Sequence, residues 1–184
     1  MKKSLLLLTA LVSMFYYSEN ARAGFLLEPY FGMNMNSTGE LGTTDVDITG
    51  NSIGARVGFQ NLGFMFGVDG RRSSWNLEPD SNADDIDATF TTLGAFVGYD
   101  FPIMLRVWGE YVLSHNGVNE NDTEYTEGSG TIIGLGYKVM PFVSLNLEIG
   151  NFETAKAKTD GGSETDLDAK YNTFLLGVSI PISL

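Results

Sequence analysis

The chain has 184 residues, of which 11 are basic and 23 acidic, and its formal charge is −12. This acidity argues against a nucleic-acid partner, because proteins that bind nucleic acids neutralise phosphates with a basic surface. The absence of cysteine excludes disulfides and zinc–thiolate sites, and no apolar run beyond residue 23 is long enough for a membrane-spanning helix.

The first 23 residues have the pattern of a signal peptide. Two lysines precede an apolar stretch, 4–12, that is too short to cross a bilayer as a helix. Ala21-Arg22-Ala23 supplies the small residues that signal peptidase accepts. We therefore expect residues 1–23 to be removed and residues 24–184 to form one outer-membrane domain. That domain has 8 basic and 22 acidic residues and a formal charge of −14.

From residue 24 onward, apolar residues recur at every second position, which is the period of a strand with two different faces. Eight such segments are predicted to be strands: 25–34, 51–60, 63–74, 89–100, 103–114, 130–140, 143–154 and 170–183. Tight turns at 60–63, 100–102 and 140–142 alternate with long polar loops at 35–50, 75–88, 115–129 and 155–169. Outer-membrane barrels alternate short periplasmic turns with longer outer loops. The sequence therefore predicts an all-β fold, an eight-stranded antiparallel up-and-down transmembrane β-barrel.

The two faces of each strand differ in polarity in a way that suits a membrane. In 143–154, Leu147 and Ile149 share one face, whereas Asn146 and Glu148 share the other. A transmembrane barrel turns its apolar face to lipid and admits polar groups inside, where they pair. One parity per strand predicts a lumen network of four acidic and four basic residues: Glu28, Arg56, Asp69, Arg71, Arg106, Glu110, Lys138 and Glu148. A soluble β-barrel would have the opposite polarity and is the alternative.

Aromatic residues cluster beside the three tight turns. Tryptophan, tyrosine and phenylalanine concentrate where hydrocarbon meets lipid headgroups. Six of them are expected to form a periplasmic girdle: Phe59, Phe64, Tyr99, Phe101, Tyr137 and Phe142.

Residues 24–184 resemble the small outer-membrane barrels of the OmpX, OmpA-domain and opacity-protein type. The end segment 174–184 resembles the C-terminal signal read by the barrel assembly machinery. The resemblance implies a monomer in the bacterial outer membrane, in contact with membrane lipid and lipopolysaccharide and without a cofactor. Pro29 and Pro181 lack an amide donor where the first and last strands must meet, so the register of that seam is left open.

The single histidine does not form a recognisable catalytic motif. Lipid A deacylases resemble this barrel and use a His-x-Ser spacing, but Gly117 occupies the position of the nucleophile after His115. The parity of 103–114 places Met104 and Ser114 inside and His115 outside, so the adjacent serine and histidine cannot easily share a hydrogen bond. We expect no catalytic residues and no bound metal.

The predicted loops are rich in carboxylates, which could attract calcium or magnesium beside anionic lipopolysaccharide. A calcium loop starting at Asp45 fails, because Arg56 occupies the position that needs a bidentate glutamate. The leading hypothesis is a non-enzymatic barrel that anchors four acidic extracellular loops for contact with an outside partner, adhesion or envelope integrity. The alternatives are a narrow channel or carrier resembling OmpW-type barrels and, third, a lipid-modifying enzyme.

Overall fold

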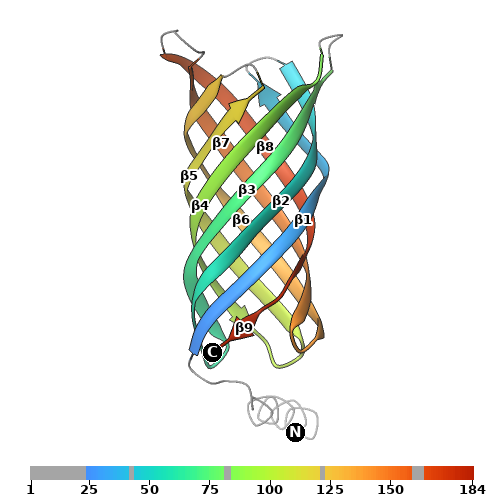
Figure 1. Cartoon of the computed structure of the whole chain (residues 1–184), viewed down its shortest axis with the longest axis vertical. Coiled ribbons are helices and arrows are strands. Elements are labelled where there is room, and N and C mark those ends of the chain that lie inside the picture. The colour runs from blue at the N-terminus through green and yellow to red at the C-terminus, as the bar shows by residue number, and fades with distance from the viewer. Residues whose placement is uncertain (1–23, 42–43, 81–83, 121–122, 159–163) are drawn as a thin grey trace, which may run out of the picture.

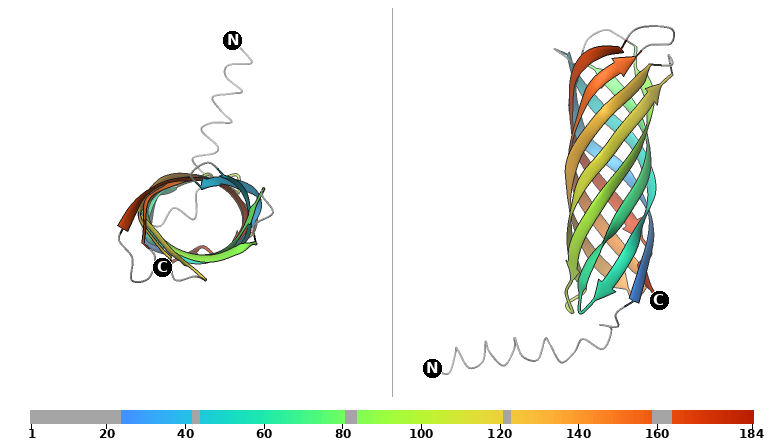
Figure 2. Two further views of the ribbon diagram at one scale, coloured as in Figure 1. Left: turned by 90° about the horizontal axis from the view of Figure 1, so that it is seen from above. Right: turned by 90° about the vertical axis from the view of Figure 1, so that its left-hand side faces the viewer.

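The computed structural model describes residues 24–41, 44–80, 84–120, 123–158 and 164–184, and these residues form a closed β-barrel. Each strand runs antiparallel to the next, and the first strand also pairs with the eighth, so that eight strands make a ring (Figures 1 and 2). The strands are β1 (Gly24–Leu41), β2 (Thr44–Asn61), β3 (Phe64–Pro79), β4 (Ile86–Asp100), β5 (Leu105–Asn119), β6 (Glu124–Met140), β7 (Val143–Lys158), β8 (Glu164–Ser179) and the short β9 (Ile182–Ser183). The predicted fold class is confirmed. No helix among the described residues is long and apolar enough to cross a membrane.

Three short turns join strands at one end of the barrel, which we call the turn end. Leu62 and Gly63 connect β2 to β3 with φ angles of 50° and 86°, as expected for a tight hairpin in which both central residues have positive φ. The β4–β5 turn is longer than predicted, because β5 begins only at Leu105. Met104 lies in this turn with a φ of 67° and is exposed. The prediction that Met104 faces inward was therefore wrong.

The strands extend much further toward the opposite end, the loop end, than the sequence predicted. Most of the four predicted loops is paired strand; β1 runs to Leu41 and β2 begins at Thr44. The alternation continues through these segments, with Val46 and Ile48 buried inside the barrel. The loop prediction gave too much weight to polar composition, because most polar residues here occupy the outward positions of the strands.

A β-bulge in β5 reverses the predicted facing of its outer end. Val112 pairs with Gly130 and His115 with Gly128, so β5 uses one residue more than β6 over this interval. Leu113 and Ser114 both turn outward, and His115 is completely buried inside. The predicted orientations of Ser114 and His115 were therefore wrong, since a bulge shifts the face of every later residue.

The seam between the first and last strands closes around both prolines. Tyr30 of β1 pairs with Ser179 of β8, and the amide of Ile180 donates to the carbonyl of Pro29 at 3.0 Å. Pro181 interrupts the last strand, after which β9 resumes pairing with β1. At the pair formed by Pro29 and Ile180 the ladder thus keeps one of its two hydrogen bonds, because proline has no amide hydrogen to return.

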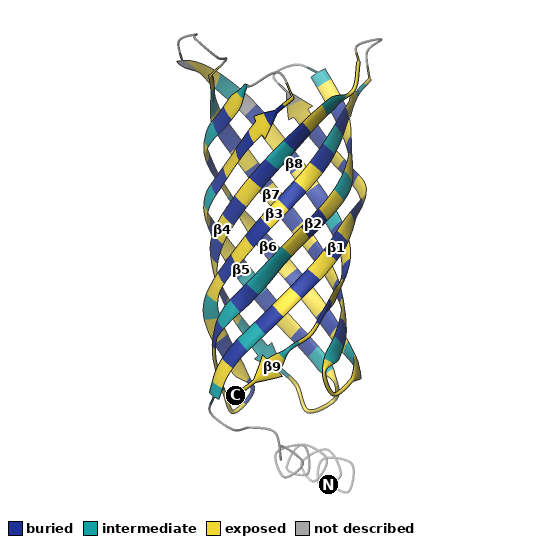
Figure 3. Ribbon diagram, viewed as in Figure 1, coloured by how far each residue is buried: buried dark blue, intermediate teal, exposed yellow. Residues whose placement is uncertain are grey.

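The outer surface of the barrel changes character along its length. Exposed and buried residues alternate along every strand (Figure 3). In the half near the turn end, the exposed positions form an apolar belt: Phe31, Ile53, Val68, Leu93, Val97, Val107, Tyr111, Ile133, Leu135, Leu145, Leu147, Ile149, Leu176 and Val178. Nearer the loop end, the exposed positions form a polar wall: Thr38, Glu40, Asp45, Asp47, Thr49, Asn51, Ser74, Glu78, Asp87, Thr91, Asn116, Glu124, Ser129, Asn151, Glu153, Lys170 and Asn172.

Candidate functional site

The polarity of the lumen also changes along the barrel, in the opposite direction to the polarity of the outer surface. Behind the apolar belt it holds buried charged residues, here called the ionic layer; for example, Glu148 lies between the belt residues Leu147 and Ile149. Behind the polar wall it holds apolar and aromatic side chains; Trp75, for example, follows the exposed Ser74. The ionic layer consists of Glu28, Arg56, Asp69, Arg71, Arg106, Glu110 and Glu148.

Arg56 of β2 lies at the centre of the ionic layer. Its guanidinium contacts Glu148, lies 3.3 Å from Glu28 and 3.1 Å from Asp69, and is almost fully buried. Its carbon Cζ also lies 4.2 Å from the centre of the Trp108 ring, a cation–π contact. One cation therefore holds carboxylates from three other strands.

Two further arginines complete the pairing. Arg106 donates to the two carboxylate oxygens of Glu28 through its two terminal guanidinium nitrogens, each at 2.7 Å. This bidentate geometry is stronger than a single hydrogen bond. Arg71 donates to Glu148 at 2.6 Å and to the hydroxyl of Tyr30 at 2.9 Å. Tyr30 in turn donates to Asp69 at 2.7 Å. Tyr30 was not predicted, although it has the same parity as Glu28 in β1.

Trp108 packs tightly against β6. A Cβ built on Gly134 would overlap the indole ring of Trp108, so a side chain here would displace the indole from beneath Arg56. We expect Gly134→Ala to lower the free energy of unfolding by about 1–3 kcal/mol through overpacking. Urea unfolding of the refolded protein would measure this change. Gly109→Ala is the matched control, because nothing lies within 4 Å of a Cβ at this position; an equal loss there would contradict the packing argument.

The ionic layer does not have the predicted four-to-four balance. Lys138 is partly exposed at the turn end and pairs with Asp100, away from the three arginines. Glu110 is buried with the layer, yet among the described residues neither of its carboxylate oxygens has a hydrogen-bond partner. The layer therefore contains four carboxyl groups and three guanidinium groups. The sequence identified these residues but could not identify which of them pair.

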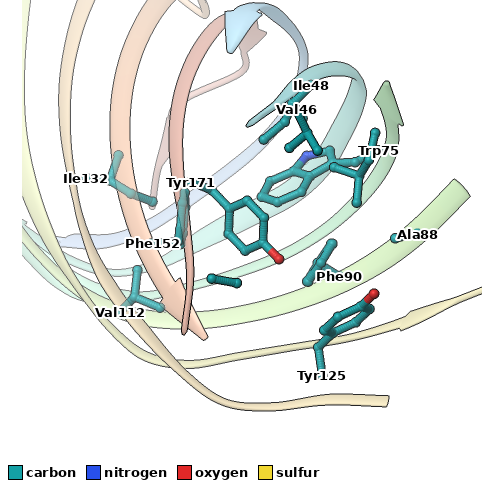
Figure 4. Close-up of a cluster of buried hydrophobic side chains, with 12 residues drawn as sticks. Val46, Ile48, Trp75, Ala88, Phe90, Val112, Tyr125, Ile132, Phe152 and Tyr171 are labelled. Carbon is teal, nitrogen blue, oxygen red and sulfur yellow. The ribbon is translucent and has the colours of Figure 1, made fainter. Parts of the chain in front are cut away.

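The loop-end half of the lumen is filled by an aromatic core (Figure 4). The ring centres of Trp75 and Phe90 are 4.6 Å apart, and Tyr171 lies 5.6 Å from Trp75. The core comprises Val46, Ile48, Trp75, Leu77, Ala88, Phe90, Val112, Tyr125, Ile132, Phe152, Ala169 and Tyr171. This half has a polar exterior and buries its apolar side chains inside, which is the arrangement that stabilises a soluble β-barrel.

His115 is part of this aromatic packing. Its ring stacks on Phe90 with centres 4.7 Å apart, and on Phe152 at 4.6 Å. Its Nδ1 lies 2.9 Å from the hydroxyl of Thr92. Ser114 faces the outside, so the two neighbours lie on opposite sides of β5. The arrangement accounts for His115 as a packed, hydrogen-bonded core residue.

The six predicted girdle residues all lie at the turn end, and five of them are exposed on the outer surface; Tyr99 is partly buried. They contact one another: the ring centres of Phe64 and Tyr99 are 4.9 Å apart, and those of Tyr99 and Phe101 4.8 Å. Phe25 and Phe66, which the sequence did not single out, each pack within about 6 Å of Phe59. Such a band is suited to the boundary between hydrocarbon and headgroups.

The carboxylates assigned to loops lie mostly on the outer ends of strands. Glu40 of β1 and Asp45 of β2 are directly paired, for example, and both are exposed. No group of three or more histidine, aspartate or glutamate side chains arranged to hold a metal ion occurs in the part of the chain that the structure describes. Asp160 and Asp122, also assigned to loops, lie outside the described residues, as do residues 1–23 of the predicted signal peptide.

Eight strands close into a ring, and the half near the turn end has an apolar exterior and a charged lumen. These two features define the fold of the small outer-membrane β-barrels. The chain is similar to Neisserial surface protein A, with a TM-score of 0.54 and 14% identity over 85% of this chain and 96% of that one. It is similar also to Ail, the attachment invasion locus protein of Yersinia pestis, with a TM-score of 0.52 and 14% identity over 88% of this chain and 100% of that one. Neither a protein-family model nor a curated protein matches the sequence. The resemblance inferred from the sequence is confirmed as a resemblance of fold.

Proposed function

We propose that the chain is a non-enzymatic protein of the bacterial outer membrane that presents a rigid, acidic surface to the outside, for adhesion or envelope integrity. The observation that carries the proposal is the double exchange of polarity along the barrel. The half with an apolar exterior and an ionic lumen suits the bilayer. The half with a polar exterior and an aromatic lumen suits water. The outer ends of the strands would then form part of the surface that partners meet.

Charge supports a cationic partner for that surface. The exposed described residues near the loop end include thirteen carboxylates: Glu40, Asp45, Asp47, Glu78, Asp80, Asp84, Asp85, Asp87, Glu120, Glu124, Glu127, Glu153 and Asp166. The basic residues on the same wall are Arg72, Lys156, Lys158 and Lys170. Such an excess attracts positively charged molecules at close range, because salt screens exposed charges beyond about 8 Å at physiological ionic strength. Assembly by the barrel assembly machinery and a monomeric state stay predictions.

The absence of cysteine allows a direct test of this placement. Thr49→Cys on the polar wall is expected to react with a membrane-impermeant maleimide on intact cells, whereas Val68→Cys in the apolar belt is expected to stay unlabelled. Both positions lie on the outer surface of the barrel, so they differ in their distance from the turn end and not in whether they face the lumen. Labelling is measured as a mass shift of the purified protein. Equal labelling of both residues on cells would contradict a membrane-embedded belt.

The filled lumen predicts the outcome for the channel alternative. Eight strands leave an interior that side chains can fill, and here Arg56, Phe90 and Tyr171 are buried within it. Refolded protein in planar bilayers is expected to show no steady single-channel conductance. Steps that recur with a fixed amplitude, and that change when Arg106 is neutralised, would favour a channel over a presenting surface.

A further inference from the structure

The apolar belt meets the polar wall on the outer face of β2, β3 and β4 in three successive cross-strand rows. The first row, which borders the belt, is Ile53–Arg72–Thr91. The next rows toward the loop end are Asn51–Ser74–Thr89 and Thr49–Asn76–Asp87. The first row thus combines an apolar and a cationic side chain, the second row is neutral and polar, and the third row ends in the carboxylate of Asp87. Along the barrel, the surface passes from the apolar belt through a row that contains Arg72 to rows of polar groups.

A recess of about 640 Å³ lies over the upper two rows. Its lining includes Asn51, Ser74, Asn76, Asp87 and Thr89. Asn76 donates a hydrogen bond to Asp87 at 3.0 Å, which orders the far end of the recess. Amides, hydroxyls and the two carboxylates of the lining, Asp87 and Glu120, are groups that hydrogen-bond to the hydroxyls of a sugar.

Arg72 is the cation at the membrane side of this recess. It is exposed, and the other described basic residues of the outer wall, Lys156, Lys158 and Lys170, lie toward the loop ends of β7 and β8. Below Arg72 on the same face comes Gly70, where a Cβ would meet nothing within 4 Å. The surface beneath the guanidinium is thus low and open, which leaves room for an acyl chain against the belt. Guanidinium groups at a membrane boundary pair with phosphate.

We propose that these rows form a docking strip for a phosphorylated glycolipid of the outer leaflet, with its phosphate on Arg72, its sugar in the recess and its acyl chains over Gly70. The inference rests on the proposed location in the outer membrane. The main support for the inference is the order of these groups along the barrel. The apolar belt, Arg72 and the polar recess follow one another in the same order as the acyl chains, the phosphate and the sugar of such a lipid. A cationic protein would be drawn instead to the carboxylates nearer the loop end.

The test uses the full mature chain refolded in phosphatidylcholine nanodiscs and titrated with a fluorescent lipid A, with binding measured by energy transfer from the two tryptophans. Wild type is expected to bind lipid A roughly tenfold more tightly than the dephosphorylated form, the effect of one charge-assisted contact. Arg72→Gln is expected to remove that difference. Ser74→Leu, which fills the recess, is expected to weaken binding of both forms. Lys158→Gln is the charge-matched control and should bind as wild type does.

Equal binding of the phosphorylated and dephosphorylated lipids by wild type would overturn the inference without any variant. So would unchanged discrimination in Arg72→Gln, or displacement of lipid A by millimolar inorganic phosphate, which would identify a free-anion site. Folding of each variant is checked by its shift between boiled and unboiled samples in detergent gels. A wild-type chain that fails to insert overturns the proposed function together with this inference, whereas one that inserts without discriminating overturns this inference alone.

Discussion

Arg56→Met is expected to destabilise the folded barrel by about 3–5 kcal/mol, the range measured when one partner of a buried ion pair is removed. Methionine keeps much of the side-chain volume, so the loss would report the charge. Arg56 contacts Glu148 and lies within 3.3 Å of both Glu28 and Asp69. Glu28 would keep Arg106 and Glu148 would keep Arg71. Asp69 would keep the hydrogen bond from Tyr30, but its nearest cation would be the more distant Arg71, at 3.9 Å.

Urea unfolding of the protein in detergent micelles, followed by tryptophan fluorescence, measures this change. Trp108 reports it locally, because it lies under the Arg56 guanidinium. Arg72→Met is the matched control, since Arg72 carries the same charge on the exposed outer wall and its replacement is expected to change stability by less than about 0.5 kcal/mol. Equal losses for the two variants would show that Arg56 does not hold the carboxylates together.

A double variant separates pairing from packing. If Arg56 acts through Glu148, then Arg56→Met combined with Glu148→Gln should lose less stability than the sum of the two single losses. In the double variant, three carboxyl groups remain with Arg71 and Arg106, whereas four remain in Arg56→Met. Strict additivity would assign the effect of Arg56 to contacts other than Glu148, which include Glu28 and Asp69 as well as the rings of Tyr30 and Trp108.

Parity was sufficient to predict the transmembrane fold because the two faces of a strand alternate without exception between bulges. The inward positions of Glu28, Arg56 and Glu148 followed from counting by twos. The same counting failed at His115, because no feature of Leu113 or Ser114 distinguishes the extra residue of a bulge from a regular one. A bulge depends on the register of two strands, which a single strand's sequence does not contain.

The extent of the strands was predictable in principle. Val46 and Ile48, and likewise Trp75 and Leu77, continue the inward alternation through segments that were assigned to loops. The signal was present, but its polarity was inverted: apolar residues face the lumen there and polar ones face outward. The pairing inside the ionic layer, by contrast, depends on which side chains from five different strands meet across the lumen. That information exists only once the barrel has closed.

Glu110→Gln is expected to change stability in the opposite direction from Arg56→Met, with a gain of about 1 kcal/mol, because a buried neutral amide without partners costs less free energy than a buried ionisable carboxyl group without partners. Glu110 packs over Gly94, where an added Cβ would meet its carboxyl group, so a glutamine of the same shape fits this position. Within the described part of the barrel neither carboxylate oxygen finds a donor. The amide cannot ionise, and its introduction breaks no ion pair.

Glu28→Gln is the control for Glu110→Gln, and the contrast between them tests the whole account of the lumen. Glu28 accepts hydrogen bonds from Arg106 at 2.7 Å and from Ser179 at 2.7 Å, so neutralising it should destabilise the barrel in the same urea experiment. Two glutamates buried behind the same apolar belt would then respond to one identical chemical change with opposite signs. Their difference would follow from pairing, since both are buried and both receive the same substitution. If Glu110→Gln instead destabilises as much as Glu28→Gln, then Glu110 must be paired with an arginine in the membrane, and Arg71 is the arginine that would have to leave Glu148 to reach it.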